Sequence, residues 1–542
     1  CGGGGGGTTP DEPTPVGPSG VCAGNGAYAL HAKAGSAEGQ TGAVLIAACT
    51  PGAVQSPQWV QTGGPPVLEM LSDKAQTLSF LPSAPGAYTF RVDFRDAAGT
   101  VRSESVVFQQ AAAAGATGLA LRLSHSVRMG GPVSVRAWPA LQSGDAVQSI
   151  TWQQVEGPAV TLDVRDPYVA LFTAPAVTGD RLIRLRATLH TTQGRSASDE
   201  ALVLVEHQPQ ASAADPDALW GGDHVARVFP FRATGPYAPL LVRCVYDPGQ
   251  RTADLCPLAQ LPLLAQANGG AAPTIEQVME RVLVSHDWIG RNFEAFLRDS
   301  DPQGDFRRML MSTTAIVIGT HVRPSFYYPG TGAIYLDADN FWLRAEERDT
   351  VNEAPDYRSG FGDALQYTSL WRYVRNGQST FRYFDPRARL QRDTGDLADE
   401  TGWLLFHELA HALDFMPPAA YAGLDPTRSA WANMAPRVAA GQLTSDLVTA
   451  LYPLRSSELA GLGQVRFLGA TASAQQIGWT PAQVAGFFAA DLATDDYAYA
   501  SRREDTAMLL EEFLMSHRYD RRRDFAISRR FGVPIRPHSP VA

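Results

Sequence analysis

The stretch Trp59-Val-Gln-Thr-Gly-Gly-Pro-Pro-Val67 recurs later in the chain as Trp152-Gln-Gln-Val-Glu-Gly-Pro-Ala-Val160. Its tryptophan, its glutamine, the glycine before the first proline, that proline and the valine keep the same offsets in both copies. Segments of alternating apolar and polar residues, such as Tyr88-Thr-Phe-Arg-Val-Asp-Phe94, surround the copies and are separated by turns rich in Gly, Pro, Asp and Ser. Such alternation is typical of strands with one buried face. The repeat therefore predicts two tandem all-β sandwiches, each with a tryptophan on an inner strand.

The repeated pattern Trp-x-Gln…Gly-Pro-x-Val is followed in each copy by a turn, at Asp96-Ala-Ala-Gly99 and at Thr191-Thr-Gln-Gly194. This arrangement resembles bacterial PKD-like and related immunoglobulin-like modules. We expect the first module over residues 20–111 and the second over residues 115–207, and both are candidate binders of protein or carbohydrate. Residues 1–19 are rich in Gly, Pro, Ser and Thr and predict a flexible tether.

The remaining part of the chain, residues 218–542, changes to a pattern of helices with a few strands. Thr274 is expected to cap a helix that runs to Phe296. The segments Thr314-Ala-Ile-Val-Ile-Gly319 and Gly332-Ala-Ile-Tyr-Leu-Asp337 are candidate strands. The predicted fold is therefore multidomain, with two N-terminal Ig-like sandwiches followed by a mainly α, α+β domain.

One predicted helix carries the motif His407-Glu-Leu-Ala-His411. Histidines four residues apart lie on one face of a helix and can bind the same zinc ion. Glu408 would then lie beside the metal and take a proton from its water. A catalytic zinc needs a third protein ligand. The metzincin pattern would place it at Pro417, which excludes that pattern, and Asp425 is a poor match to the aspzincin pattern.

The wider motif H-E-x-x-H-x-x-D, followed by Y-x6-E-x-x-A at the start of a later helix, resembles gluzincin peptidases of the anthrax lethal factor type. It is also similar to the titration-factor peptidases. This resemblance implies a zincin-like domain with Glu504 as the third zinc ligand and Tyr497 as the phenol that stabilises the oxyanion. It also implies that Asp414 is an outer partner of a ligand histidine.

Other residues compete for some of these roles. Glu511 and Glu512 are rival ligands or solvated helix residues, and Tyr499 is a rival to Tyr497 as the phenol. The insertion between His411 and Glu504 is longer than we expect for this family.

Two further segments predict features of the surface of this domain. Gly332–Leu336 is a candidate edge strand, along which a peptide substrate would pair. The basic run Arg521-Arg-Arg523 is expected to lie on a solvated helix face.

The five cysteines indicate the cellular compartment in which the protein is expected to lie. Cys1 stands before a Gly/Thr/Pro/Ser tract and resembles the lipidated residue of a processed bacterial lipoprotein. This resemblance implies a lipid anchor in the bacterial cell envelope, with the outer membrane favoured. The other four form two local pairs, Cys22 with Cys49 and Cys244 with Cys256, as expected for disulfides in an oxidising compartment. Four unpaired cysteines are the alternative.

The overall charge and hydropathy narrow the function classes. The net charge of −10 argues against nucleic acid as a partner, and no apolar run is long enough for a transmembrane helix. The favoured hypothesis is a membrane-anchored zinc metallopeptidase with Zn²⁺ as its cofactor and extracytoplasmic proteins or peptides as its substrates. The membrane would be its other partner, through Cys1. The alternatives are an adhesion or scaffold lipoprotein with a degenerate zincin domain, and a zinc amidase that acts on cell-wall peptides.

Overall fold

The computed structural model divides into two compact units, residues 1–209 with 352–354 and residues 210–351 with 355–542. It describes residues 20–22, 24–33, 37–113, 115–123, 127–209, 211–212, 214–220 and 227–530. Cys1 and the predicted tether lie outside the described residues, so lipid attachment and the exact module boundaries stay predictions. Among the described residues, no helix combines the length and the apolar character needed to cross a membrane.

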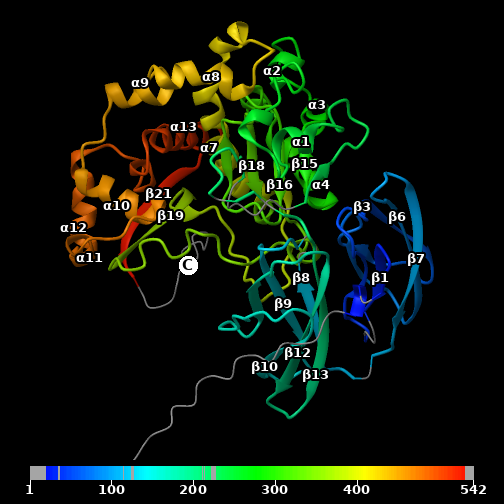
Figure 1. The fold of residues 1–542 in the computed structure, drawn as a ribbon. Coiled ribbons are helices and arrows are strands. Elements are labelled where there is room, and N and C mark those ends of the chain that lie inside the picture. Colours follow the sequence, from blue (N-terminus) through cyan, green and yellow to red (C-terminus); the bar gives the residue numbers. More distant parts are fainter. Residues whose placement is uncertain are drawn as a thin grey trace, which may run out of the picture. The chain divides into compact units, whose positions relative to one another are not determined.

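The first sandwich consists of two antiparallel sheets around one apolar core (Figure 1). Trp59 lies in this core with 1% of its surface exposed, and its indole N–H donates to the carbonyl oxygen of Ala75. The strands, in spatial order, are β1 (Tyr28–Ala32), β2 (Gly42–Ala48), β5 (Thr77–Leu81) and β4 (Glu69–Met70) in one sheet, and β3 (Gln55–Gly63), β6 (Gly86–Arg95) and β7 (Val101–Gln110) in the other.

The second sandwich repeats this plan with its own core. Trp152 is half-buried at the edge of that core, and its indole N–H donates to the carbonyl oxygen of Pro167. The strands, in spatial order, are β11 (Val169–Thr173), β9 (Pro132–Ala140) and β8 (Gly118–Leu123) in one sheet, and β10 (Val147–Glu156), β12 (Arg181–Thr191) and β13 (Ser196–Val205) in the other.

The repeated glutamine has the same contacts in both sandwiches. The side-chain amides of Gln61 and Gln154 each donate to a proline carbonyl four residues later, at 2.6 Å. Their Oε1 atoms accept from the backbone N–H of Val67 (3.1 Å) and of Val160 (3.0 Å). The motif therefore specifies a turn that a side chain closes, which explains why glutamine, proline and valine recur together.

The two sandwiches belong to one compact unit and share a buried apolar contact. All seven residues of β2 are buried, because its second face packs against the outer face of β12 and β13. The apolar side chains of this contact are Ala43, Leu45, Ala47, Leu182, Leu202 and Leu204.

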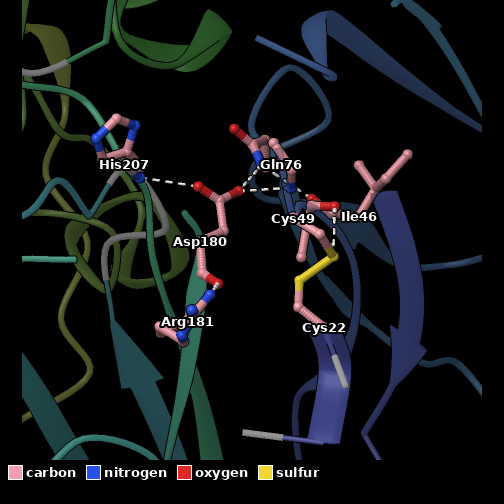
Figure 2. Close-up of a disulfide and its surroundings, with 9 residues drawn as sticks. Cys22, Ile46, Cys49, Gln76, Asp180, Arg181 and His207 are labelled. Carbon is pink, nitrogen blue, oxygen red and sulfur yellow. Dashed lines mark hydrogen bonds between the residues drawn. A yellow bond between two sulfur atoms is a disulfide. The ribbon is translucent and has the colours of Figure 1, made fainter. Parts of the chain in front are cut away.

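Asp180 adds polar contacts to the same junction (Figure 2). One carboxylate oxygen accepts from the Ala48 backbone N–H (2.7 Å) and from the Gln76 amide (2.6 Å). The other accepts from the His207 backbone N–H at 2.8 Å. The predicted disulfide Cys22–Cys49 lies beside this carboxylate, and the disulfide Cys244–Cys256 is also formed, so both predicted pairs are confirmed.

The second unit is a mixed α/β region, which confirms the predicted fold class. Its main sheet contains, in spatial order, β14 (Phe229–Pro230), β15 (Val282–Val284), β16 (Ile316–Gly319), β18 (Ala333–Asp337) and β17 (Phe326–Tyr328). Alternate residues of β16 and β18 pack into two different apolar clusters, so this sheet is covered on both faces. One of these clusters contains apolar residues of α7 (Thr394–Phe415), the helix with the predicted metal motif, together with residues of α4 (Asp287–Ser300) and α5 (Asp305–Leu310), among others.

Further helices complete this unit. Those before α7 are α1 (Leu241–Val245), α2 (Leu264–Ala267), α3 (Ile275–Met279) and α6 (Ala345–Arg348). The segment between the predicted metal motifs forms α8 (Ala430–Ala439), α9 (Thr444–Leu451), α10 (Ser457–Leu468), α11 (Ala474–Gly478) and α12 (Pro481–Gly486), and is followed by α13 (Arg502–Tyr519). A second sheet in this unit contains β20 (Gln378–Ser379), β19 (Tyr367–Arg375) and β21 (Arg522–Arg529).

Three local predictions are wrong. Thr274 caps a helix as expected, but the helix expected to run to Phe296 is interrupted by β15, because Val282-Leu-Val284 pairs with the parallel strand β16. The candidate edge strand lies inside the sheet as β18, and β17 occupies the edge. The basic run Arg521–Arg523 leads into strand β21 rather than a helix face.

Candidate metal site

Helix α7 brings the two motif histidines to one face. Asp393 caps the helix by accepting from the Asp396 backbone N–H at 2.9 Å. The apolar face of α7 packs on α4 and α5, where the rings of Phe306 and Phe406 stack at 4.5 Å. His407 and His411 then lie one turn apart, with ring centroids separated by 5.0 Å. These core contacts fix the orientation of α7, and His407 and His411 lie on a different side of this helix.

Helix α13 brings Glu504 to the same point. Ser501 caps this helix, and its side chain accepts from the Glu504 backbone N–H at 3.2 Å. Glu504 Oε2 lies 3.0 Å from His407 Nε2 and 3.2 Å from His411 Nε2. The three potential ligand atoms all lie within 4.8 Å of one another. The structure thus brings together the three residues predicted as metal ligands.

This donor set fits a metal ion such as zinc. Two imidazole nitrogens and one carboxylate oxygen are the ligands of the His₂Glu class of catalytic zinc sites, which leave one position open. Because both Nε2 atoms face the same carboxylate oxygen, a single ion can lie between all three.

The close approach of these residues shifts the pKa values of His407 and Glu504. Burial lowers the pKa of His407, but hydrogen bonds with Glu504 and Glu511 outweigh it and raise this pKa well above its ordinary value. Burial raises the pKa of Glu504, but the charge of His411 and hydrogen bonds from both histidines hold that pKa well below its usual range. The cluster therefore places a partly buried carboxylate close to two imidazoles.

Glu408, the predicted general base, is buried beside the histidines with 5% of its surface exposed. Burial raises the pKa of its carboxyl, and the neighbouring charges of His407 and His411 act in the opposite direction. A carboxylate with a raised pKa in an enclosed site accepts a proton more readily than one in water.

Tyr497, the predicted phenol, lies over the first histidine. Its ring is 5.9 Å from the ring of His407 at an interplanar angle of 29°, and it packs edge-on against Phe467. Burial and the charge of Glu504 raise its pKa well above the ordinary tyrosine value, so the phenol keeps its proton. The hydroxyl of the rival Tyr499 instead donates to Asp491 at 2.8 Å.

Glu511 is the outer partner of His407, although the sequence suggested it as a rival ligand or a solvated helix residue. Glu511 is fully buried, and its Oε2 accepts from His407 Nδ1 at 3.0 Å. Its Oε1 accepts from the Tyr373 hydroxyl at 2.5 Å. Glu511 is therefore neither a solvated residue nor part of the ligand group. Such a contact fixes the tautomer and the orientation of a ligand histidine.

Asp414 has different partners from those that the resemblance implies. Its carboxylate accepts from the Ser445 backbone N–H (2.8 Å) and hydroxyl (2.6 Å), and from Arg503 at 3.4 Å. These contacts join α7 to the start of α9 and to α13. In this structure, the aspartate of the motif thus connects helices around the site.

Comparisons with known proteins assign no family to this chain. No family model matches the sequence, and no curated protein matches it. Among solved structures, the PKD domain of the KIAA 1837 protein is 16% identical over 16% of this chain and 88% of its own, with a TM-score of 0.14. The fibronectin(III)-like modules of Clostridium thermocellum CbhA are 12% identical over 33% of this chain and 94% of their own, also at 0.14.

SGBP-B of the Bacteroides ovatus mixed-linkage glucan utilization locus, in complex with a mixed-linkage heptasaccharide, is 15% identical over 32% of this chain and 47% of its own, with a TM-score of 0.11. At such scores these likenesses support no statement about function. What the chain itself contains is two N-terminal β-sandwiches and a His-His-Glu group in its helical C-terminal region.

Proposed function

We propose that this protein is a zinc-dependent peptidase that acts outside the cytoplasm. The observation that carries the proposal is the convergence of His407, His411 and Glu504 at one point, with Glu408 in the next position of the same helix. The two disulfides support an oxidising compartment for the chain.

The residues of the site have complementary roles in this proposal. When bound, zinc supplies Lewis acidity that polarises the scissile carbonyl and makes water a better nucleophile. Glu408 accepts the proton of the attacking water and passes it to the leaving amine. The Tyr497 hydroxyl donates to the oxyanion as the carbonyl becomes tetrahedral. Glu511 holds the His407 ring through Nδ1, so that Nε2 faces the ligand position.

Strand β17 is the proposed support for an extended substrate. It is antiparallel to β18 and occupies an edge of the main sheet. Tyr327 of this strand lies against Phe415 of α7, with ring centroids 5.7 Å apart. A peptide added to this edge would form main-chain hydrogen bonds along a strand that contacts the motif helix.

The first experiment combines metal analysis with a Glu408→Gln variant. We expect one zinc per chain in both proteins, hydrolysis of a mixed peptide library by the wild type, and a loss of about 10²–10⁴-fold in the variant. Glu400→Gln is the matched control, because Glu400 lies two turns earlier on α7 outside the metal group and burial raises its pKa to about 7. A wild type without zinc, or an active Glu408→Gln enzyme, would contradict the proposal and favour an adhesion or scaffold role.

A further inference from the structure

Arg523 is a buried cation next to the candidate metal site. It lies on β21, and 6% of its side chain is exposed. Its guanidinium contacts the carboxylates of Asp495 (2.5 Å), Glu511 (3.0 Å) and Glu512 (3.6 Å). It also lies over the Trp371 ring at 4.2 Å. A charge buried to this extent is tolerated only when it is well paired, so the arrangement around Arg523 is specific.

One contact of Arg523 leads to a predicted metal ligand. Arg523 Nη1 donates to Glu511 Oε1, which also accepts from Tyr373. The other oxygen of Glu511 accepts from His407 Nδ1. Two donors thus hold one oxygen of Glu511 in place, which directs the other toward the imidazole. The His407 Nε2 atom is then left to face Glu504.

A second contact leads to the predicted phenol. Arg523 Nη2 donates to Asp495 Oδ2, and Asp495 Oδ1 accepts from the Tyr497 backbone N–H at 2.7 Å. This bond holds the first residue of the 3₁₀ turn Tyr497–Tyr499, whose leading ring stacks on His407. The Arg523 guanidinium therefore contacts both the carboxylate that holds the His407 ring and the carboxylate that holds the Tyr497 backbone.

We propose that Arg523 is a positioning residue that couples the orientation of the ligand His407 to the placement of Tyr497. The inference rests on the proposed metal centre, although its contacts are independent of the reaction. A planar guanidinium can direct separate N–H groups at two carboxylates at once, whereas a lysine ammonium is a point charge without this geometry. Replacement of Arg523 by lysine should keep the buried charge and lose the double contact.

The test measures zinc affinity of the full chain by competition with a chromogenic chelator. We expect Arg523→Lys to weaken zinc binding about tenfold or more, as is typical when an outer partner of a ligand histidine is disturbed. Arg522→Lys is the matched control, since Arg522 is the exposed neighbour on the same strand and should bind zinc like the wild type. Thermal unfolding of each variant establishes that the fold is intact.

A double-variant cycle identifies the route of the effect. If Arg523 acts through Glu511, then Arg523→Lys combined with Glu511→Gln should bind zinc no more weakly than Glu511→Gln alone. Wild-type affinity in Arg523→Lys, or additive losses in the double variant, would overturn the inference.

Asp495→Asn tests the second contact and also serves if Arg523→Lys does not fold. An amide has only one acceptor oxygen for the two donors Arg523 Nη2 and the Tyr497 backbone N–H, so the variant should lower kcat about tenfold or more while KM stays unchanged. Zinc affinity should fall less than in Arg523→Lys, because the Tyr373 hydroxyl still holds Glu511. A wild-type kcat in this variant would overturn the coupling to Tyr497.

A wild-type protein that binds no zinc would defeat the proposed function separately. The inference would then be judged from the Nδ1 proton of His407 in ¹⁵N-histidine-labelled protein. This proton should exchange with water faster in Arg523→Lys than in the wild type, because Glu511 is held less firmly as its acceptor. Equal exchange rates would overturn the inference.

Discussion

At the scale of single residues, two glutamates of α13 contact the same imidazole from opposite sides. Glu504 lies at Nε2 of His407, and Glu511, seven residues later, accepts from Nδ1. Residues seven apart return to the same helix face after two turns, so both carboxylates reach the ring of α7. The next residue, Glu512, is turned away from this face, and burial raises its pKa to about 7. One position along a helix thus separates a residue that contacts the imidazole from one that contacts only Arg523 among the residues of this network.

The proposed role of Tyr497 gives a prediction for a single hydroxyl. Tyr497→Phe keeps the ring beside His407 and Phe467 but removes the donor, so we expect kcat to fall about 10²–10³-fold with zinc content unchanged. The measurement is steady-state peptide hydrolysis with metal analysis. Tyr499→Phe is the control and should stay active, because the Tyr499 hydroxyl bonds to Asp491. Full activity in Tyr497→Phe would exclude the phenol from the reaction.

At the scale of elements, the sequence repeat encodes a turn with a required backbone shape. Gly64 and Gly157, the equivalent glycines of the two copies, have φ of +91° and +98°. A Cβ atom at either position would lie 2.1 Å from the carbonyl oxygen of Ala87 or of Leu182. The glycine therefore recurs because the turn passes against the backbone of the neighbouring strand.

This geometry predicts a difference between two glycine variants. Gly64→Ala combines an unfavourable φ with a backbone collision and should destabilise the protein by about 2–5 kcal/mol. Gly99→Ala, at a hairpin turn with φ +79° and no neighbour within 4 Å, should cost only about 1–2 kcal/mol. Thermal unfolding of the full chain compares the two. Equal losses would show that the collision at Gly64 is relieved by movement of the turn.

At the scale of the whole molecule, the first unit contains two sandwiches that share a buried junction. Beside the apolar contact, Lys33 and Asp199 form an ion pair at 2.5 Å, with 4% and 1% of their side chains exposed. Asp199 also accepts from the Leu121 backbone N–H at 2.8 Å. An ion pair between modules that is this buried favours joint rather than separate unfolding of the two sandwiches.

The ion pair predicts a strongly non-additive pair of variants. Asp199→Asn or Lys33→Met alone leaves a buried charge unpaired and should cost about 3–5 kcal/mol. The double variant should cost less than the sum of the two, as measured by chemical unfolding of the full chain. The exposed pair Arg91–Asp93 is the control, for which removal of either partner should cost about 1 kcal/mol or less. Additive losses at Lys33 and Asp199 would contradict a coupled junction.

Features that depend on local spacing, on a sequence repeat or on cysteines that are close in the chain could be predicted from the sequence. The helix with His407 and His411 on one face, the two sandwiches and both local disulfides were expected and are formed. The failures have one cause in common. Val282–Val284 fits a helix or a strand, and only pairing with β16 selects the strand.

Contacts between distant segments required the fold itself. Nothing in the basic run Arg521–Arg523 distinguishes an exposed arginine from the buried Arg523, and Glu511 pairs with a histidine 104 residues earlier in the chain. Local spacing follows from the repeat geometry of a helix or strand, so it can be read along the chain. The identity of a side chain's partner depends on how whole elements pack, because burial and charge pairing are properties of the assembled core.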